Sequence, residues 1–143
     1  MENLSPYIVA PAVGWLVAQG LKYVIMSFKG RKLKSVRQLY LSGSMPSAHS
    51  ATTVSLLVVI ALRDGIESSI FGLALLFTAV VMYDAVMVRR SSGEQGQALT
   101  ELIKEKLSKV RLPRVAKGHT PIEVVGGALV GLVVGVSISS ILL

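Results

Sequence analysis

Four apolar segments alternate with polar segments along the chain. They cover about residues 7–28, 46–62, 66–88 and 121–143, and each is close to the ~20 residues that a helix needs to cross a hydrocarbon core. The second segment is the shortest, so a buried or re-entrant helix is an alternative interpretation for it. The pattern predicts an all-α integral membrane protein, a single domain over 1–143 with a bundle of about four transmembrane helices.

The polar connection between the third and fourth segments has a helical pattern of its own over about 94–110. Its apolar residues recur at spacings of three and four: Leu99, Leu102, Ile103, Leu107 and Val110. Charged residues occupy the other face, which is typical of an amphipathic helix lying in the membrane interface. We expect either a plain connector on the bilayer surface or an element that covers a site.

Composition agrees with a membrane protein and narrows its class. Hydrophobic residues make up 52% of the chain, and the mean hydropathy is +0.63, which is high for a soluble domain of this size. There are no cysteines, so disulfides and thiolate metal sites are excluded. The first six residues lack the basic region of a cleavable signal peptide, so we expect the first apolar segment to remain as a span.

Basic residues are concentrated in two of the connections. Segment 29–37 holds five and segment 89–117 holds eight, together 13 of the 15 lysines and arginines. The positive-inside rule therefore predicts a multi-pass protein of the cell membrane with these loops in the cytoplasm and both termini outside. Attraction to anionic lipid explains most of this charge. We do not expect nucleic-acid binding, because the charge flanks membrane spans and no aromatic stacking residues are interleaved with it.

Three glycines are spaced by four in the last apolar segment, at Gly127, Gly131 and Gly135. Consecutive G-x-x-x-G steps allow two helices to approach closely. We expect this face to pack either inside the bundle or against a second copy in a homodimer.

Five ionisable residues interrupt the apolar segments or lie at their ends. They are Lys22, His49, Asp84, His119 and Glu123. At ~1.5 Å per residue, all lie within about 10 Å of one membrane interface. Intramembrane charges are costly and mark functional sites, so polar groups delivered by four helices to one layer predict a shared site. Structural roles are the alternative: Glu123 can complete a capping box with Thr120, and Lys22 can reach the interface.

Asp84 is deep enough in its segment to need a cationic partner. Arg89, five residues further on, is not well placed on the same face of a regular α-helix. We therefore expect Lys22 from the first segment to compete for Asp84.

Phosphate binding is the chemistry that best suits these groups. Helix N-termini bind anions, and two of them are expected at this end together with two arginines. One histidine can attack phosphorus while the other protonates the leaving oxygen, and a carboxylate one turn away can orient the attacking imidazole. His119 and Glu123 have that spacing of four. The candidate phosphate-binding residues are Ser47, Lys22, Asp84, Arg89 and Arg90.

Three sequence blocks carry a resemblance to a known family. They are GSMPSAHSA at 43–51, DAVMVRRSSGEQ at 84–95, and GHTPIEV at 118–124. Together they resemble the divergent branch of the type 2 phosphatidic acid phosphatase family, which is related to acid phosphatases and vanadium-dependent haloperoxidases. The blocks occur in order, and the resemblance covers nearly the whole chain.

The resemblance implies a phosphatase that hydrolyses a lipid phosphomonoester or diphosphate through a phosphohistidine, without a cofactor. The run Pro46-Ser47-Ala48-His49 is similar to the P-S-G-H block of the wider family, which implies phosphate contacts at Ser47 and a general acid at His49. His119 and Glu123 are similar to the second half of its S-R-x5-H-x3-D block. They are therefore implied to be the nucleophile and the acid that orients it.

The chain departs from the pattern of the wider family at two places. Six residues before His119 stands Pro113 rather than arginine, so the two arginines after the third segment are the expected replacements. The opening K-x6-R-P block is also absent, although Lys22 and Lys29 have the spacing of its basic residues.

Two other classes of function stay open. One is a protein that binds or transports an anionic lipid without hydrolysing it. The other is a metal-dependent activity at a site built from His49, His119, Asp84 and Glu123.

Overall fold

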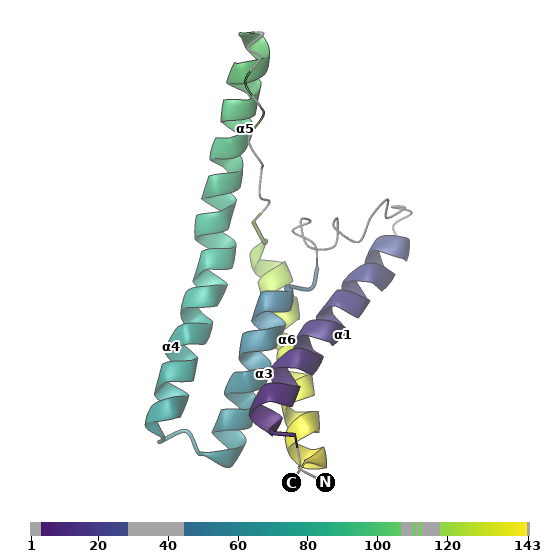
Figure 1. The fold of residues 1–143 in the computed structure, drawn as a ribbon, viewed down its shortest axis with the longest axis vertical. Helices are drawn as coiled ribbons and strands as arrows, with labels where there is room; N and C mark the ends of the chain where they lie inside the picture. The colour runs from purple at the N-terminus through teal and green to yellow at the C-terminus, as the bar shows by residue number, and fades with distance from the viewer. Residues whose placement is uncertain (1–3, 29–44, 107–109, 111, 113–117, 143) are drawn as a thin grey trace.

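The described part of the chain is a bundle of helices without strands (Figure 1). The computed structural model describes residues 4–28, 45–106, 110, 112 and 118–142. The predicted all-α fold is confirmed. The elements in chain order are α1 (Pro6–Phe28), α3 (Ala48–Arg63), α4 (Ser69–Tyr83), the π-helical turn η1 (Asp84–Val88), α5 (Arg89–Glu105) and α6 (Pro121–Ile141).

Among the described residues, three helical segments are long and apolar enough to cross a membrane: α1, the continuous helix Ser69–Glu105, and α6. The shorter helix α3 nevertheless extends between both ends of the bundle. At its start the amide of Ser47 donates to the carbonyl of Glu123 at 2.9 Å, and at its end Arg63 donates to the carbonyl of Leu142. These contacts join it to the two ends of α6, so α3 passes through the bundle and does not turn back as a re-entrant helix would.

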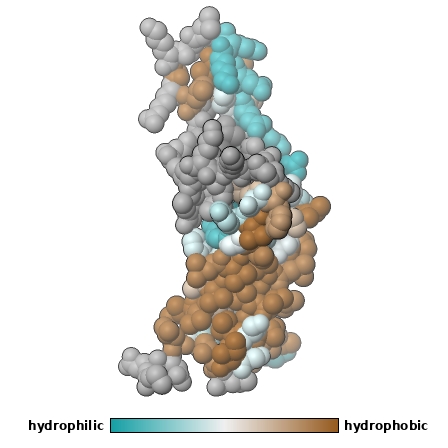
Figure 2. All heavy atoms as spheres, turned by 90° about the vertical axis from the view of Figure 1, so that its right-hand side faces the viewer, coloured by the Kyte–Doolittle hydropathy of each residue, from teal (hydrophilic) through white to brown (hydrophobic). Residues whose placement is uncertain are grey.

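The third long helix continues beyond the apolar part of the molecule. α4 and η1 have 15 and 5 residues, about 30 Å of helix, which matches a hydrocarbon core. Figure 2 shows a broad hydrophobic surface with hydrophilic residues above it, at the end where Figure 1 has α5. α5 extends in line with α4 (Figure 1). Of the segment expected at about 94–110, the part up to Glu105 is helical and prolongs α4.

The closest helix contact joins α6 to α3 through the glycine face. The paired positions are Gly127 with Ser47, Gly131 with Ala51, and Gly135 with Ser55. A Cβ added at Gly131 would lie 2.6 Å from the carbonyl oxygen of Ala51, so only glycine allows this approach. Both numbers of each pair rise together, which means that the two helices are parallel and in register turn for turn.

Helix α3 of the same chain therefore packs against the glycine face. This is the expected arrangement in which the glycines lie inside the bundle. All three glycines are buried there. A homodimer stays a prediction, and it would have to form through another face.

α3 lies at the centre of the bundle, because the other helices pack around it. On α1, Gly14 brings the helix backbone close to Ser55 Oγ and the carbonyl of Ala51, which a Cβ would meet at 2.8 and 3.0 Å. On α4, Thr78 donates its hydroxyl to the carbonyl of Thr53 at 3.4 Å. The start of α3 is consequently surrounded by residues of several helices, which is where the candidate site lies.

Candidate functional site

His119 and Glu123 form a buried pair at the start of α6. His119 Nδ1 lies 3.2 Å from Glu123 Oε2, and the two side chains are 9% and 17% exposed. Burial lowers the pKa of His119 below the ordinary value of histidine, and the hydrogen bond to Glu123 opposes this without overcoming it. His119 is therefore neutral near pH 7. With its proton on Nδ1 facing Glu123, its Nε2 carries a free electron pair.

Glu123 also organises the helix ends around this pair. Its Oε2 accepts the amide of Thr120 at 2.9 Å, and its own amide donates to Thr120 Oγ1, which completes a capping box. Its carbonyl accepts the amide of Ser47 just before α3. The capping role and the histidine-orienting role, which the sequence left as alternatives, are both geometrically present. The positive N-terminal ends of α3 and α6 lie side by side as a result.

The segment that carries His119 is fixed against the π-helical turn η1. The amide of His119 donates to the carbonyl of Ala85 at 3.0 Å. The neighbouring Gly118 approaches the backbone of Arg90 so closely that a Cβ there would overlap it. A π-turn shifts the hydrogen-bond pattern to i+5, so a carbonyl such as that of Ala85 can serve a partner outside the helix. This contact ties the start of α6 to the third helix.

The same π-turn pairs Asp84 with Arg89. Arg89 Nε donates to Asp84 Oδ2 at 2.8 Å, and both side chains are about half exposed. Lys22, which we expected to compete for Asp84, interacts with Glu123 instead. Residues five apart come onto one face when the helix widens to a π-turn, and the amide of Arg89 indeed bonds to the carbonyl of Asp84.

Lys22 and His49 complete a polar cluster with these residues. Lys22 on α1 is buried, and the charged group that interacts with it is Glu123. His49, in the first turn of α3, is exposed. Its electrostatic neighbours are Arg89, His119, Lys22 and Asp84. The structure therefore brings together the five ionisable residues that the sequence assigned to one depth.

Ser47 and Arg90 are near the cluster but have other contacts. Ser47 is fully buried, and its Oγ caps α3 by accepting the amide and the hydroxyl of Ser50. Arg90 donates to Glu94 at 3.2 Å on the exposed face of α5. It also lines a hollow of about 310 Å³ that includes His119 and Thr120. Phosphate binding by either residue stays a prediction.

A metal site built from these residues does not fit the geometry. Within the described ranges, no three His, Asp or Glu side chains are grouped so that they could hold a metal ion. The combination of His49, His119, Asp84 and Glu123 therefore forms a charge cluster and not a coordination shell.

Comparison with known proteins identifies the family. The family model described as "Divergent PAP2 family" matches residues 4–134, which include every candidate site residue. The chain belongs to the divergent PAP2 family. A relative, the uncharacterized membrane protein YuiD of Bacillus subtilis (strain 168), is 32% identical over 151 residues, covering 92% of this chain and 93% of that protein. No solved structure matches the chain.

Membership in the divergent PAP2 family confirms the resemblance that the three sequence blocks carry. A possible relationship to phosphatases follows from it, whereas no specific activity does. Both motif histidines, His49 and His119, lie in the cluster. The basic segment 29–37 and Pro113 are outside the described residues.

Sequence reasoning missed two structural parts of the site. The carbonyl of Ala85 holds His119, and Gly118 allows the close approach to Arg90. Gly118 gave a usable signal, because glycine is the residue that permits a close approach of the backbone. The π-turn gave none, since Asp84 is followed by four apolar residues that a regular α-helix would accommodate equally well.

We predict that His119 makes stability depend on pH near neutrality. Its pKa is lower in the folded protein than in the unfolded chain, where it is about 6.5. As pH falls through 6.5 the unfolded state takes up the proton first, so the free energy of unfolding should decrease and then level off below the folded pKa. Denaturant unfolding in detergent between pH 8 and 5 measures this. The variant His119→Gln should have a shallower dependence, and an identical pH profile for both proteins would contradict the prediction.

Proposed function

We propose that the protein is a membrane-embedded phosphatase that hydrolyses a lipid phosphomonoester or diphosphate through a phosphohistidine on His119. The observation that carries the proposal is the buried pair of His119 and Glu123, with Nδ1 facing the carboxylate at 3.2 Å. A neutral imidazole held in this tautomer has a nucleophilic Nε2. Membership in the divergent PAP2 family supports a phosphatase-like chemistry for such a pair.

The surroundings of His119 suit a phosphate group. Lys22 and Arg89 supply positive charge near it, since both interact electrostatically with His119. The adjacent N-termini of α3 and α6 add the positive ends of two helix dipoles. Arg89 has five N–H donors, of which the bond to Asp84 uses one. These groups would stabilise the charge that develops on phosphate oxygens during transfer.

The reaction divides between the two histidines. Nε2 of His119 attacks phosphorus, the bond from phosphorus to the leaving oxygen breaks, and protonated His49 gives its proton to that oxygen. The lipid alcohol, or the lipid monophosphate from a diphosphate, then leaves. Water attacks the phosphohistidine while neutral His49 takes a proton from it. The P–N bond breaks, its electron pair returns to Nε2, and inorganic phosphate is released.

A second candidate function is supported by the ion pairs of the arginines. Arg89 and Arg90 are paired with Asp84 and Glu94, and the arginine of the wider family's block is absent from position 113. A site that lacks this arginine, and whose two other arginines are partly engaged by carboxylates, would hold an anionic lipid without accelerating its hydrolysis. Binding of phosphatidic acid without phosphate release would favour this function.

We predict that the site faces the cytoplasm. The ends of the helices that flank both basic segments are at the site end of the bundle, and the positive-inside rule assigns that end to the cytoplasm. The chain has no cysteine, so single cysteines can be introduced without background. In intact cells, an impermeant maleimide should label position 67 and should reach position 97 only after permeabilisation. The reverse pattern would mean that the site faces outward.

We predict unequal losses of activity when the site residues are changed. Phosphate release from dioleoyl phosphatidic acid in mixed micelles should be abolished in His119→Ala, because the nucleophile is gone. In His49→Ala it should fall by about 10²–10⁴-fold, the usual worth of general acid–base help. A phosphoenzyme could still form in that variant when the leaving group is good. Glu123→Gln should lose less, since the amide still caps α6.

The matched control is Glu67→Gln, the same change at an exposed residue at the opposite end of the bundle. It should release phosphate at the wild-type rate. Full activity of His119→Ala would contradict the proposal. Complete loss of wild-type activity on adding a chelator would mean that the reaction depends on a metal ion.

A further inference from the structure

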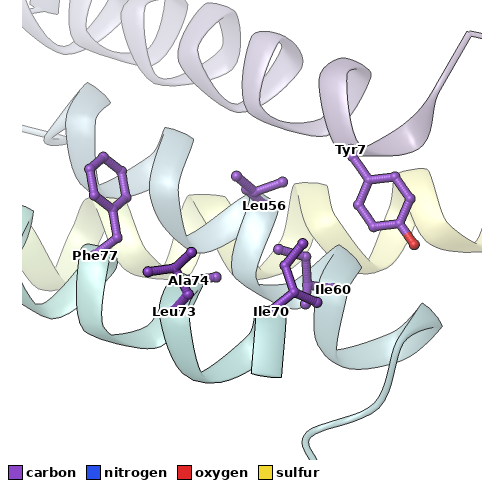
Figure 3. Close-up of a pocket in the computed structure, with 7 residues that line it drawn as sticks. All are labelled: Tyr7, Leu56, Ile60, Ile70, Leu73, Ala74 and Phe77. Carbon is purple, nitrogen blue, oxygen red and sulfur yellow. The ribbon is translucent and has the colours of Figure 1, made fainter. Parts of the chain in front are cut away.

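An apolar groove lies on the side of the bundle, where α1, α3 and α4 meet (Figure 3). It has a volume of about 500 Å³ and is lined by residues of α1, α3 and α4. Leu56 and Ile60 of α3 contribute to it, as do four residues of α4 that include Ala74 and Phe77. Tyr7 of α1 closes one end, and its hydroxyl donates to Asp64 at 2.8 Å. The polar atom of Tyr7 is therefore satisfied, and the remaining lining side chains are hydrocarbon.

On both α3 and α4, residues that line this groove share a helix face with residues of the polar cluster. On α3, Leu56 and Ile60 are seven and eleven residues after His49, so all three lie within about 20° of one face. On α4, Phe77 is seven residues before Asp84, which again leaves the two on one face. His49 and Asp84 also interact electrostatically. The groove and the cluster thus lie along the same faces of α3 and α4.

The groove begins about 10 Å from the cluster, because Leu56 is seven residues after His49 on α3. From His49 to Ile60 the helix rises about 17 Å. Half of a typical hydrocarbon core is about 15 Å. A hydrocarbon chain that begins at the cluster would therefore reach the bilayer midplane within the groove. A lipid of the leaflet at the site end has this arrangement of head group and chain.

We propose that the groove binds one hydrocarbon chain of the phosphate-bearing lipid whose head group lies at the polar cluster. The proposal rests on the proposed function for the identity of the head group. The groove fixes the chain along α3, and the phosphate is thereby held beside His49 and His119. Selectivity for lipid phosphates with a long chain, over short-chain or water-soluble phosphate esters, follows from this arrangement. Any bulk lipid would fill the groove equally well if the cluster did not select the head group.

A photocrosslinking experiment separates these two cases. The wild-type protein is placed in phosphatidylcholine nanodiscs that contain a small fraction of phosphatidic acid with a diazirine at mid-chain. Parallel nanodiscs contain phosphatidylcholine with the same diazirine chain at the same mole fraction. Labelling of Leu56 and Phe77, mapped by mass spectrometry, should be several-fold greater with phosphatidic acid. Moving the diazirine toward the chain end should shift the labelling toward Ile60. Equal labelling by the two lipids would overturn the proposal.

Filling the groove provides a second, independent test. Ala74→Trp adds an indole to the wall of the groove and should reduce labelling by phosphatidic acid to the phosphatidylcholine level. The matched control is Ala79→Trp, the same change at an exposed position of α4 that does not line the groove, and it should keep the wild-type preference. If the indole prevents folding, Ala74→Leu replaces it. Unchanged preference in a folded Ala74 variant would overturn the proposal.

Phosphate release measured in the same nanodiscs keeps this proposal separate from the proposed function. Selective labelling without phosphate release would uphold the groove and reject hydrolysis. Phosphate release without selective labelling would uphold hydrolysis and reject the groove. In a hydrolysing protein, Ala74→Trp should raise KM for dioleoyl phosphatidic acid and leave turnover of a water-soluble phosphomonoester unchanged.

Discussion

The parallel contact between α3 and α6 determines where the polar groups of this protein meet. Gly127, Gly131 and Gly135 allow the two backbones to approach turn for turn. Because the helices are parallel and in register, both begin at the same end of the bundle and at the same depth. Two helix N-termini that are far apart in the sequence thereby become neighbours. A larger residue at Gly131 would have to displace α3, and the two N-termini would separate.

Glu123 converts this helix contact into a defined environment for His119. One carboxylate oxygen accepts the amide of Thr120 and faces Nδ1 of His119. The backbone carbonyl of the same residue holds Ser47. Burial keeps the imidazole neutral, and the carboxylate selects which nitrogen carries the proton. The π-turn then fixes the third helix to the same place through Ala85. Orientation, tautomer and the surrounding charges of His119 consequently depend on a few contacts.

The broad architecture could be predicted from the sequence, because the architecture depends on segment length, apolar character and residue spacing. Segment length and apolar character predicted the helices, and the cost of intramembrane charge predicted that Lys22, His49, Asp84 and Glu123 would share a layer. The capping box at Thr120 was readable because its residue types stand at a fixed spacing. The glycine spacing indicated a close helix contact, and the choice of α3 as the partner needed the structure.

The errors of the sequence analysis have one main physical cause. A single π-turn at Asp84–Val88 changes which residues share a face of the helix, and no residue type in it predicts a π-turn. It pairs Asp84 with Arg89 where a regular α-helix would not. It is also the join at which α4 continues into α5 in one line, so the amphipathic segment begins as a prolongation of the third helix. Periodicity arguments assume 3.6 residues per turn, and they fail where that assumption fails.

We expect Glu123 and burial to hold His119 neutral, with its proton on Nδ1 and a free electron pair on Nε2. Nitrogen-15 NMR of histidine-labelled protein in nanodiscs measures this directly. The chain has two histidines, so a His49→Gln sample assigns the signal of His119. At pH 6.5, where a free histidine is half protonated, the account predicts a His119 that is mostly neutral with a protonated Nδ1. A charged imidazolium, or a neutral ring with its proton on Nε2, would contradict it.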